Sequence, residues 1–318
     1  MSTKVLITGA LGYLGGRIAD YLANQKEYEL LLGLRGKRLI PESLSSSRCV
    51  TIDLTDSASL ETACRGIDAI VHLAALNEID SSKDPELALQ INGAGTLKLL
   101  QAAEYSGVKR FIYFSTAHVY GAPLVGTITE TTFARPVHPY AITHRTAEDF
   151  VFAAHTRKSM EGITVRLSNG FGAPLTSDVN RWTLVFNDLC RQAVETGQLK
   201  LQSTGLQRRD FITLHDVASG VHHLLSLPSS LCSDGLFNLG GELPLRIIDV
   251  AERIQARCAE IMEFTPALLR PEPEQGEVSN DLDYRIDKLK ATGFKLTGNM
   301  DNEIDATLRL CLKEFRTS

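Results

Sequence analysis

The sequence of 318 residues contains no apolar run of the roughly 18 residues that a transmembrane helix requires, so we expect no membrane span. Its first residues also lack the long apolar stretch and the cleavage site that are typical of a secretory signal. The six cysteines form no CxxC pair and have no close histidine partner, which predicts that there is no metal site. Free thiols, mostly buried, are typical of a protein in the reducing cytoplasm, where we expect this chain.

The sequence also has no excess of basic residues over acidic ones. The formal net charge is −5, so neither nucleic acid nor an anionic membrane is favoured as a partner. The chain has no internal repeat and no low-complexity tract. Its hydrophobic content of 43% and charged content of 22% are ordinary for a soluble globular enzyme. The length suits one large domain, or two domains that share a cleft.

Short apolar runs alternate with helical patterns through the first half of the chain. The runs expected to be strands are 4–8, "YELLLGL", "RCVTIDL", "DAIVHLAA", "RFIYFST" and "ITVRLSN", and the helical patterns cover 13–24, 85–105 and 139–155. This rhythm predicts an α/β fold, a doubly wound Rossmann-type parallel sheet over residues 1–168. Residues 169–318 read as a smaller, mainly substrate-binding part, in which segments around 209–240 return to the sheet.

A glycine-rich turn follows the first predicted strand directly. "TGALGYLGG" places Gly9, Gly12 and Gly15 between that strand and a helix, with the spacing GxxGxxG. Glycines let the backbone turn tightly and approach a pyrophosphate, and the helix N-terminus offers free N–H groups and a positive dipole end. The pattern therefore predicts a dinucleotide site, and the alternative is a tight strand–helix turn without a ligand.

The end of the second predicted strand bears on the choice of cofactor. "LLLGLRGKR" has no acidic residue that could bind a ribose 2′-hydroxyl, but it carries Arg35, Lys37 and Arg38. An arginine here can accept a 2′-phosphate, so we predict NADP, with NAD as the alternative. After the third strand, Asp53 can accept a hydrogen bond from the adenine amino group, with Leu54 packed nearby. The alternative for Asp53 is a role in a turn or an N-cap.

Five segments together resemble a known family. They are "TGALGYLG", "VHLAA", "FSTAHVYG", "PYAITHRTAE" and "RRDFITLHDVA", and their order and spacing are similar to those of the extended short-chain dehydrogenase/reductases, in the group of nucleotide-sugar epimerases, dehydratases and reductases. The resemblance runs from Lys4 to about Gly241. It implies the following cofactor-binding residues: Gly9, Gly12, Tyr13, Leu14, Gly15, Arg35, Asp53, Leu54, Ala74, Tyr140 and His144.

The resemblance also implies the catalytic residues. Thr116, with Ser115 as a substitute, matches the hydroxyl residue that orients the substrate, and Tyr140 matches the acid/base. His144 stands where the family has a lysine that holds the nicotinamide ribose and lowers the tyrosine pKa by its charge. A histidine has an ordinary pKa of about 6.5, so it is mostly neutral at pH 7 and activates the tyrosine less.

Three interpretations of His144 follow from this. In the first, the enzyme works with Tyr140 and a ribose-binding His144. In the second, His118 shares the proton transfer at the substrate. In the third, the chain is an NAD(P)-binding sensor or scaffold with little turnover. A His144→Lys variant discriminates among them. A large gain in turnover would show that the native site is weakened, and no turnover from either form, with intact cofactor binding, would support the sensor.

The substrate side of the resemblance rests on two further residues. Asn169 and Arg209 match positions that hold the diphosphate of a nucleotide sugar, and for Arg209 the alternative is an ion pair with Asp210 or Asp216. The loop 173–182, with the single tryptophan, lies where relatives shape the sugar pocket.

Two reaction types stay open for such a substrate. A 4,6-dehydration is disfavoured because Ala117 and His118 replace the expected carboxyl pair. Epimerisation and net ketone reduction remain, and reduction of a non-sugar carbonyl is a further alternative. The resemblance also implies a homodimer that pairs through the helices over 85–105 and 139–155.

Overall fold

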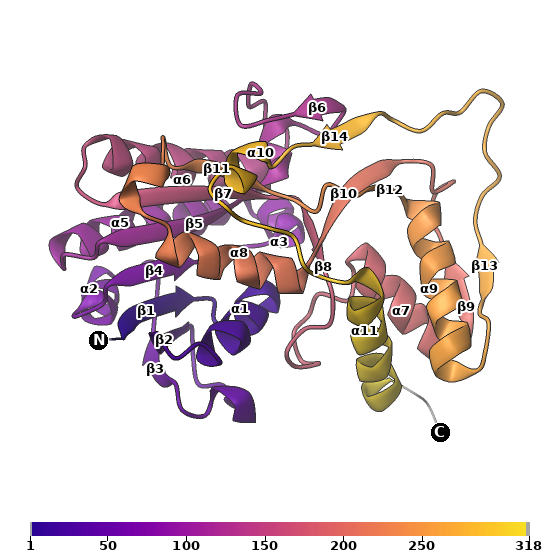
Figure 1. Ribbon diagram of the computed structural model, residues 1–318, viewed down its shortest axis with the longest axis horizontal. Coiled ribbons are helices and arrows are strands. Elements are labelled where there is room, and N and C mark those ends of the chain that lie inside the picture. The colour runs from indigo at the N-terminus through magenta and orange to yellow at the C-terminus, as the bar shows by residue number, and fades with distance from the viewer. Residues whose placement is uncertain (1, 316–318) are drawn as a thin grey trace.

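The computed structural model describes residues 2–315 (Figure 1). Its centre is a seven-stranded sheet in the order β11-β7-β5-β4-β1-β2-β3, with every neighbouring pair parallel. The strands are β1 (Thr3–Thr8), β2 (Tyr28–Leu34), β3 (Arg48–Thr51), β4 (Ala69–His72), β5 (Arg110–Thr116), β7 (Glu161–Leu167) and β11 (Leu236–Leu239). The α/β prediction with a Rossmann-type parallel sheet is confirmed.

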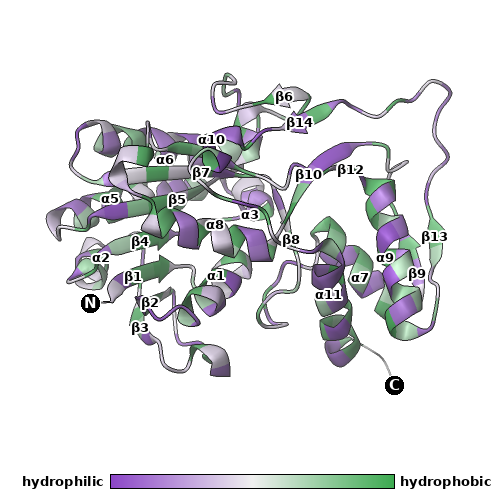
Figure 2. Cartoon of the chain, viewed as in Figure 1, coloured by the Kyte–Doolittle hydropathy of each residue, from purple (hydrophilic) through white to green (hydrophobic). Residues whose placement is uncertain are grey.

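Helices cover both faces of this sheet, which explains why its strands are apolar throughout. Along β1, Val5 and Ile7 belong to one core cluster and Leu6 to another, because successive strand side chains point to opposite faces. The first core lies under α1 (Tyr13–Ala23) and α8 (Leu214–Ser226), and the second under α2 (Ser57–Cys64), α5 (Thr96–Tyr105) and α6 (Pro139–Thr156). Figure 2 shows hydrophobic residues along the central strands and helices that are hydrophilic on part of their surface.

The helical pattern predicted over 85–105 is not one regular helix. It consists of α4 (Pro85–Ala88), a π-helical segment η2 (Leu89–Gly95) and α5. Asn92 in the π-helical segment accepts a hydrogen bond from the Leu76 amide at 2.7 Å and donates one to Thr143 of α6 at 3.1 Å. The wider turn thus ties the loop after β4 to α6, and π-helical turns are frequent at functional sites.

The second half of the chain adds a smaller layer beside the sheet. Its three-stranded sheet has the order β12 (Pro244–Arg246), β10 (Arg208–Thr213), β8 (Asn169–Phe171), and α7 (Val185–Thr196), α9 (Ile247–Met262) and α11 (Met300–Glu314) pack around a third core (Figure 1). Of the segments around 209–240, β11 joins the large sheet beside β7, whereas β10 pairs with β8 and β12.

The remaining elements are short. Two parallel pairs join β6 (Gly126–Ile128) to β14 (Leu282–Tyr284) and β9 (Gln198–Lys200) to β13 (Ala267–Leu269). The other helical segments are η1 (Glu42–Leu44), α3 (Glu78–Lys83), η3 (Ala117–Tyr120), η4 (Ser229–Leu231) and α10 (Asp287–Lys290). Over the described range 2–315, no helix combines the length and the apolar character needed to cross a membrane.

Candidate active site

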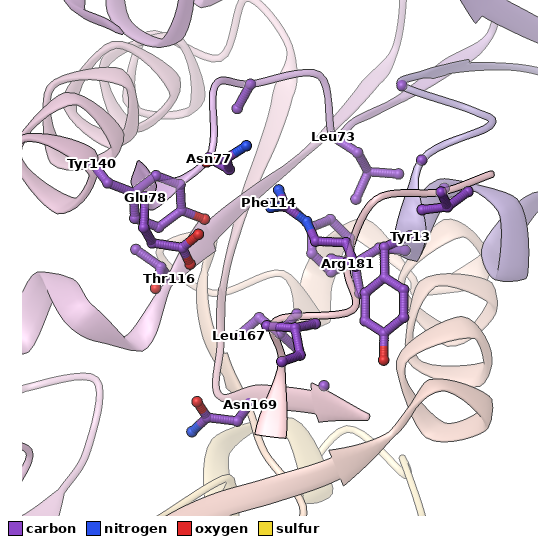
Figure 3. A pocket seen from close by; sticks show the side chains of 18 of the residues that line it. Tyr13, Leu73, Asn77, Glu78, Phe114, Thr116, Tyr140, Leu167, Asn169 and Arg181 are labelled. Carbon is purple, nitrogen blue, oxygen red and sulfur yellow. The ribbon is translucent and has the colours of Figure 1, made fainter. Parts of the chain in front are cut away.

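A pocket of about 570 Å³ opens at the carboxyl ends of β1, β4 and β5, where it meets β8, β10 and the loop that precedes α7. Figure 3 shows part of its wall, with Tyr140, Glu78 and Thr116 on one side and Tyr13 and Arg181 on the other. In open parallel sheets, ligands bind at this edge. The following predicted site residues line the pocket: Gly9, Gly12, Tyr13, Leu14, Gly15, Ala74, Thr116, His118, Tyr140, His144, Asn169 and Arg209.

The glycine turn is built for close backbone contact. Gly9 has φ +67°, a left-handed conformation that favours glycine, and its carbonyl accepts the Gly12 amide at 2.8 Å. A Cβ on Gly15 would lie 2.1 Å from the Gly9 carbonyl oxygen, so no side chain fits there. Gly12 is the N-cap of α1, whose N-terminal N–H groups face the pocket. These residues fit a pyrophosphate.

Tyr13 lines the pocket and also forms hydrogen bonds that connect two parts of the chain. Its hydroxyl donates to the Gly172 carbonyl at 2.9 Å and lies 3.4 Å from the Asn187 amide oxygen. Burial raises the pKa of Tyr13 above its ordinary value, so this hydroxyl stays protonated. Tyr13 therefore joins the start of α1 to the loop after β8.

Three predicted cofactor residues lie outside the pocket wall: Arg35, Asp53 and Leu54. Arg35 is exposed, and Leu54 is buried against Gly95. The Asp53 carboxylate accepts hydrogen bonds from the Thr55 amide at 2.8 Å and the Thr55 hydroxyl at 2.7 Å, and the neighbouring Asp56 is the N-cap of α2. Their roles toward the adenosine end stay predictions. Arg38 does line the pocket, where it pairs with Asp178.

His144 is buried beside Tyr140, with 4.3 Å between the two ring centroids. Its Nδ1 lies 2.6 Å from the hydroxyl of Tyr113 on β5, while its Nε2 has no partner among the described residues. Burial lowers the pKa of His144 to about 3 and raises the pKa of Tyr113, so both groups are neutral. In one tautomer the Tyr113 hydroxyl donates to Nδ1 and the His144 Nε2 carries the proton as a free N–H donor, and in the other tautomer Nδ1 donates to the Tyr113 oxygen.

The neutral ring leaves Tyr140 without a cation at position 144. Burial raises the pKa of Tyr140, the Glu78 carboxylate raises it further, and the Arg181 guanidinium opposes them. Thr116, on the same side of the pocket, has its hydroxyl oxygen 3.2 Å from the His118 amide, which donates to it. The pair of hydroxyl groups predicted from the sequence therefore lines the same pocket.

The His118 side chain also lines this pocket from the segment after β5. Desolvation in the cleft lowers its pKa, and the Glu78 carboxylate acts in the opposite direction. A neutral imidazole beside Thr116 is able to accept a proton, so the geometry keeps open a share in proton transfer.

Asn169 of β8 pairs in register with Phe211 of β10, two residues after Arg209. The Asn169 amide donates to the Asp210 carbonyl at 2.9 Å. Arg209 forms no ion pair with any carboxylate in the described range, and desolvation lowers its pKa. Asp210 instead accepts the amides of Gly241 and Leu243, at 2.9 Å and 2.8 Å. The alternative of an Arg209–Asp210 ion pair is therefore wrong.

Asp216, the other predicted partner of Arg209, is buried and occupied elsewhere. It accepts hydrogen bonds from Thr297, Gly298 and the Thr213 hydroxyl. The cationic side chain of Arg209 thus faces the pocket without a protein counter-ion.

Sequence reasoning missed three residues near Tyr140: Tyr113, Glu78 and Arg181. Arg181 lies in the loop 173–182 that we assigned to the sugar pocket, and Glu78 follows the "VHLAA" motif closely, so both positions carried a signal. Trp182 is a packing residue: it is 7% exposed, its Nε1 donates to the Ser177 carbonyl at 3.2 Å, and it makes an edge contact with Phe315.

Comparison with known proteins places this geometry in context. Residues 5–240 match the model of the NAD dependent epimerase/dehydratase family. An uncharacterised UDP-glucose epimerase from Bacillus subtilis, YtcB, is 27% identical over 278 residues, which cover 81% of this chain and 84% of that protein. The UDP-glucuronate 4-epimerase of Thermodesulfobacterium geofontis is also 27% identical, over 80% of this chain and 81% of its own length.

Solved structures share the fold. The UDP-glucuronic acid 4-epimerase from Bacillus cereus, in complex with NAD, superposes with a TM-score of 0.81 over 97% of this chain and 96% of its own. Its sequence identity is 22%, so this similarity concerns the fold.

Proposed function

The chain belongs to the NAD dependent epimerase/dehydratase family, and from that premise we propose that it is a nucleotide-sugar epimerase that uses a nicotinamide dinucleotide. The observation that supports the proposal is that one pocket contains both a predicted cofactor site and a predicted substrate site. The cofactor site is the glycine turn of residues 9–15, and the substrate site contains Asn169 and the unpaired Arg209. Tyr140 and Thr116 lie on the same wall. The relatives named as epimerases of UDP-sugars support this choice.

The chemistry assigns one task to each residue. The bound nicotinamide would accept a hydride from a sugar carbon and return it. Tyr140 would take the proton from the oxygen on that carbon and give it back, while the Thr116 hydroxyl orients the same oxygen. Asn169 and Arg209 would hold the diphosphate, because a guanidinium binds phosphate oxygens in a bidentate way.

His144 would act toward the cofactor as a hydrogen-bond donor. The buried Nε2 has no partner among residues 2–315, and in the tautomer that carries its proton there, a ribose hydroxyl is a suitable acceptor. Tyr113 would hold this tautomer in place from the other side of the ring. We therefore favour a working enzyme with a ribose-binding His144 over a sensor or scaffold with little turnover.

The choice between NADP and NAD rests on the end of β2. We keep NADP as the prediction because Arg35 is exposed there and no carboxylate takes the place of a ribose binder. NAD is the alternative, and the Bacillus cereus structure contains NAD. An NADP that exchanges freely would favour a ketoreductase, since an epimerase must keep its cofactor through the cycle.

Three further expectations belong to this proposal. They are a boundary near residue 168 between cofactor-binding and substrate-binding parts, a cytoplasmic location and a homodimer. Five of the six cysteines are buried free thiols, which fits a reducing compartment. Apolar side chains are exposed on α6 and on η2, and they fit a dimer surface. They are Leu89, Ile142, Phe150 and Phe152.

The test begins with the purified protein. Denaturing it and identifying any released dinucleotide by mass spectrometry shows whether a nicotinamide cofactor is retained.

NMR then follows UDP-glucose, UDP-glucuronate and UDP-N-acetylglucosamine for a change of configuration at the sugar ring. We expect an epimer with the wild type and none with Tyr140→Phe. Consumption of NADPH with a keto substrate but no epimer would indicate a reductase, of a sugar or of a non-sugar carbonyl. Failure to bind either dinucleotide would refute the proposal.

A further inference from the structure

The pocket contains three arginines, and they differ in what they pair with. Arg38 pairs with Asp178 at the pocket edge, and Arg209 lines the pocket from β10. Arg181 forms no ion pair with a carboxylate of the described range, and its backbone carbonyl accepts the Asn187 side chain at 3.3 Å. Its guanidinium is therefore free to act on the pocket interior.

Arg181 approaches Tyr140 from the opposite wall. Figure 3 shows its side chain extending into the pocket from the loop before α7, while Tyr140 and Glu78 lie across from it. The loop is held by the Trp182 ring, which is buried and bonded to the Ser177 carbonyl. A fixed loop of this kind holds the guanidinium within the pocket without a protein anion to neutralise it.

Four groups from four different segments can set the charge around Tyr140. His144 on α6 is neutral because burial disfavours its charged form. Burial also disfavours the charged form of His118 on η3. Glu78 at the start of α3 is the anion of the group. Arg181 is the cation of the group, and its charge lowers the Tyr140 pKa.

We propose that Arg181 supplies, from the loop before α7, the positive charge that relatives place four residues after the catalytic tyrosine. A cation near a phenol favours the phenolate, whichever side it comes from. The inference rests on the proposed function, since it concerns how Tyr140 becomes a base. It makes Arg181 a residue that tunes Tyr140, and it explains how the site tolerates a neutral His144.

The direct test measures the acidity of the phenol without turnover. A fluorinated tyrosine, which is more acidic than tyrosine, is incorporated at position 140 and titrated by 19F NMR. Arg181→Gln should raise its apparent pKa by about 1 unit or more, and Arg181→Lys should keep most of the effect. Arg209→Gln is the matched control, because it removes a cation of the same pocket and should leave the titration unchanged. In the Arg181→Gln background, His144→Lys should restore the lower pKa.

Activity provides the second readout. In Arg181→Gln, the acidic limb of the kcat profile should move to higher pH by the same amount, with thermal stability unchanged. An unshifted fluorine titration would overturn the proposal, and a rise in KM alone would then identify Arg181 as a substrate-binding residue. An equal shift in Arg209→Gln would also overturn it, because the effect would be the general field of the pocket. If the titration shifts while the wild type has no epimerase activity, the charge assignment stands and the proposed function fails.

Discussion

Replacing His144 by lysine would return a cation to the position from which relatives activate their tyrosine. The ring centroids of Tyr140 and His144 are 4.3 Å apart, so a lysine at position 144 would lie beside the phenol, and we take about 5 Å as the separation of the two charges. At an effective dielectric constant of about 20, a unit charge at about 5 Å contributes about 3 kcal/mol, or about 2 pKa units. We therefore expect His144→Lys to lower the Tyr140 pKa by about 2 units.

Burial of the new lysine works against this gain. Desolvation lowers the pKa of a buried lysine. Since its ordinary pKa is about 10.4, the pKa has to fall by about 3 units before half of the groups are neutral at pH 7. The Tyr113 hydroxyl that now bonds Nδ1 would be free to accept a hydrogen bond from the new ammonium. The charged form is thus supported in the variant.

The assay is the pH dependence of kcat with the nucleotide sugar that the wild type converts best. The acidic limb should move down by about 2 pH units in His144→Lys, because the phenolate forms at lower pH. His144→Gln is the matched control: it keeps a neutral N–H donor and should leave the limb where it is. Normal folding and cofactor binding in the lysine variant, combined with an unmoved limb, would refute the electrostatic reasoning.

Three other predictions follow from the same contacts. Tyr113→Phe leaves the buried His144 Nδ1 without its donor, so we expect a loss of about 1–3 kcal/mol in the free energy of unfolding, measured by denaturant titration, and weaker dinucleotide binding by calorimetry; full affinity would contradict the tautomer assignment. Glu78→Gln removes the anion that raises the Tyr140 pKa, so the acidic limb of the kcat profile should move to lower pH. This shift is opposite in sign to that of Arg181→Gln, and a shift to higher pH would contradict the assignment. Gly15→Ala introduces a Cβ that would lie 2.1 Å from the Gly9 carbonyl oxygen, so dinucleotide binding should fall at least tenfold by calorimetry, whereas unchanged binding would exclude the glycine turn as the pyrophosphate site.

The predictable part of the site is encoded in short segments. Gly9, Gly12 and Gly15 follow one strand within a few residues, and Thr116 comes at the end of another, so alternating periodicity was enough to bring them to one sheet edge. Because the carboxyl ends of parallel strands lie at the same edge of the sheet, residues that follow different strands are expected close together in space. The same reasoning predicted the parallel sheet but not the order of its strands.

The missed part depends on contacts between distant segments. Tyr113 and His144 are 31 positions apart, on a strand and on a helix, and no periodicity predicts that their polar atoms meet. The helix α7 begins only at Val185, and its N-cap residue Leu184 provides no side-chain cap. Arg181 therefore stays in a loop and reaches the pocket. The Asp53 carboxylate forms a local turn with Thr55, and its role toward the adenine stays a prediction.

The central claim is that Tyr140 works beside a neutral His144 whose Nε2 carries the proton. Nitrogen-15 NMR of protein labelled only in histidine tests this directly, with His144→Gln to assign the signal. We predict one protonated and one unprotonated ring nitrogen for His144 throughout pH 5 to 8, because burial lowers its pKa to about 3. A His144 ring that takes up a second proton within this range would contradict the account.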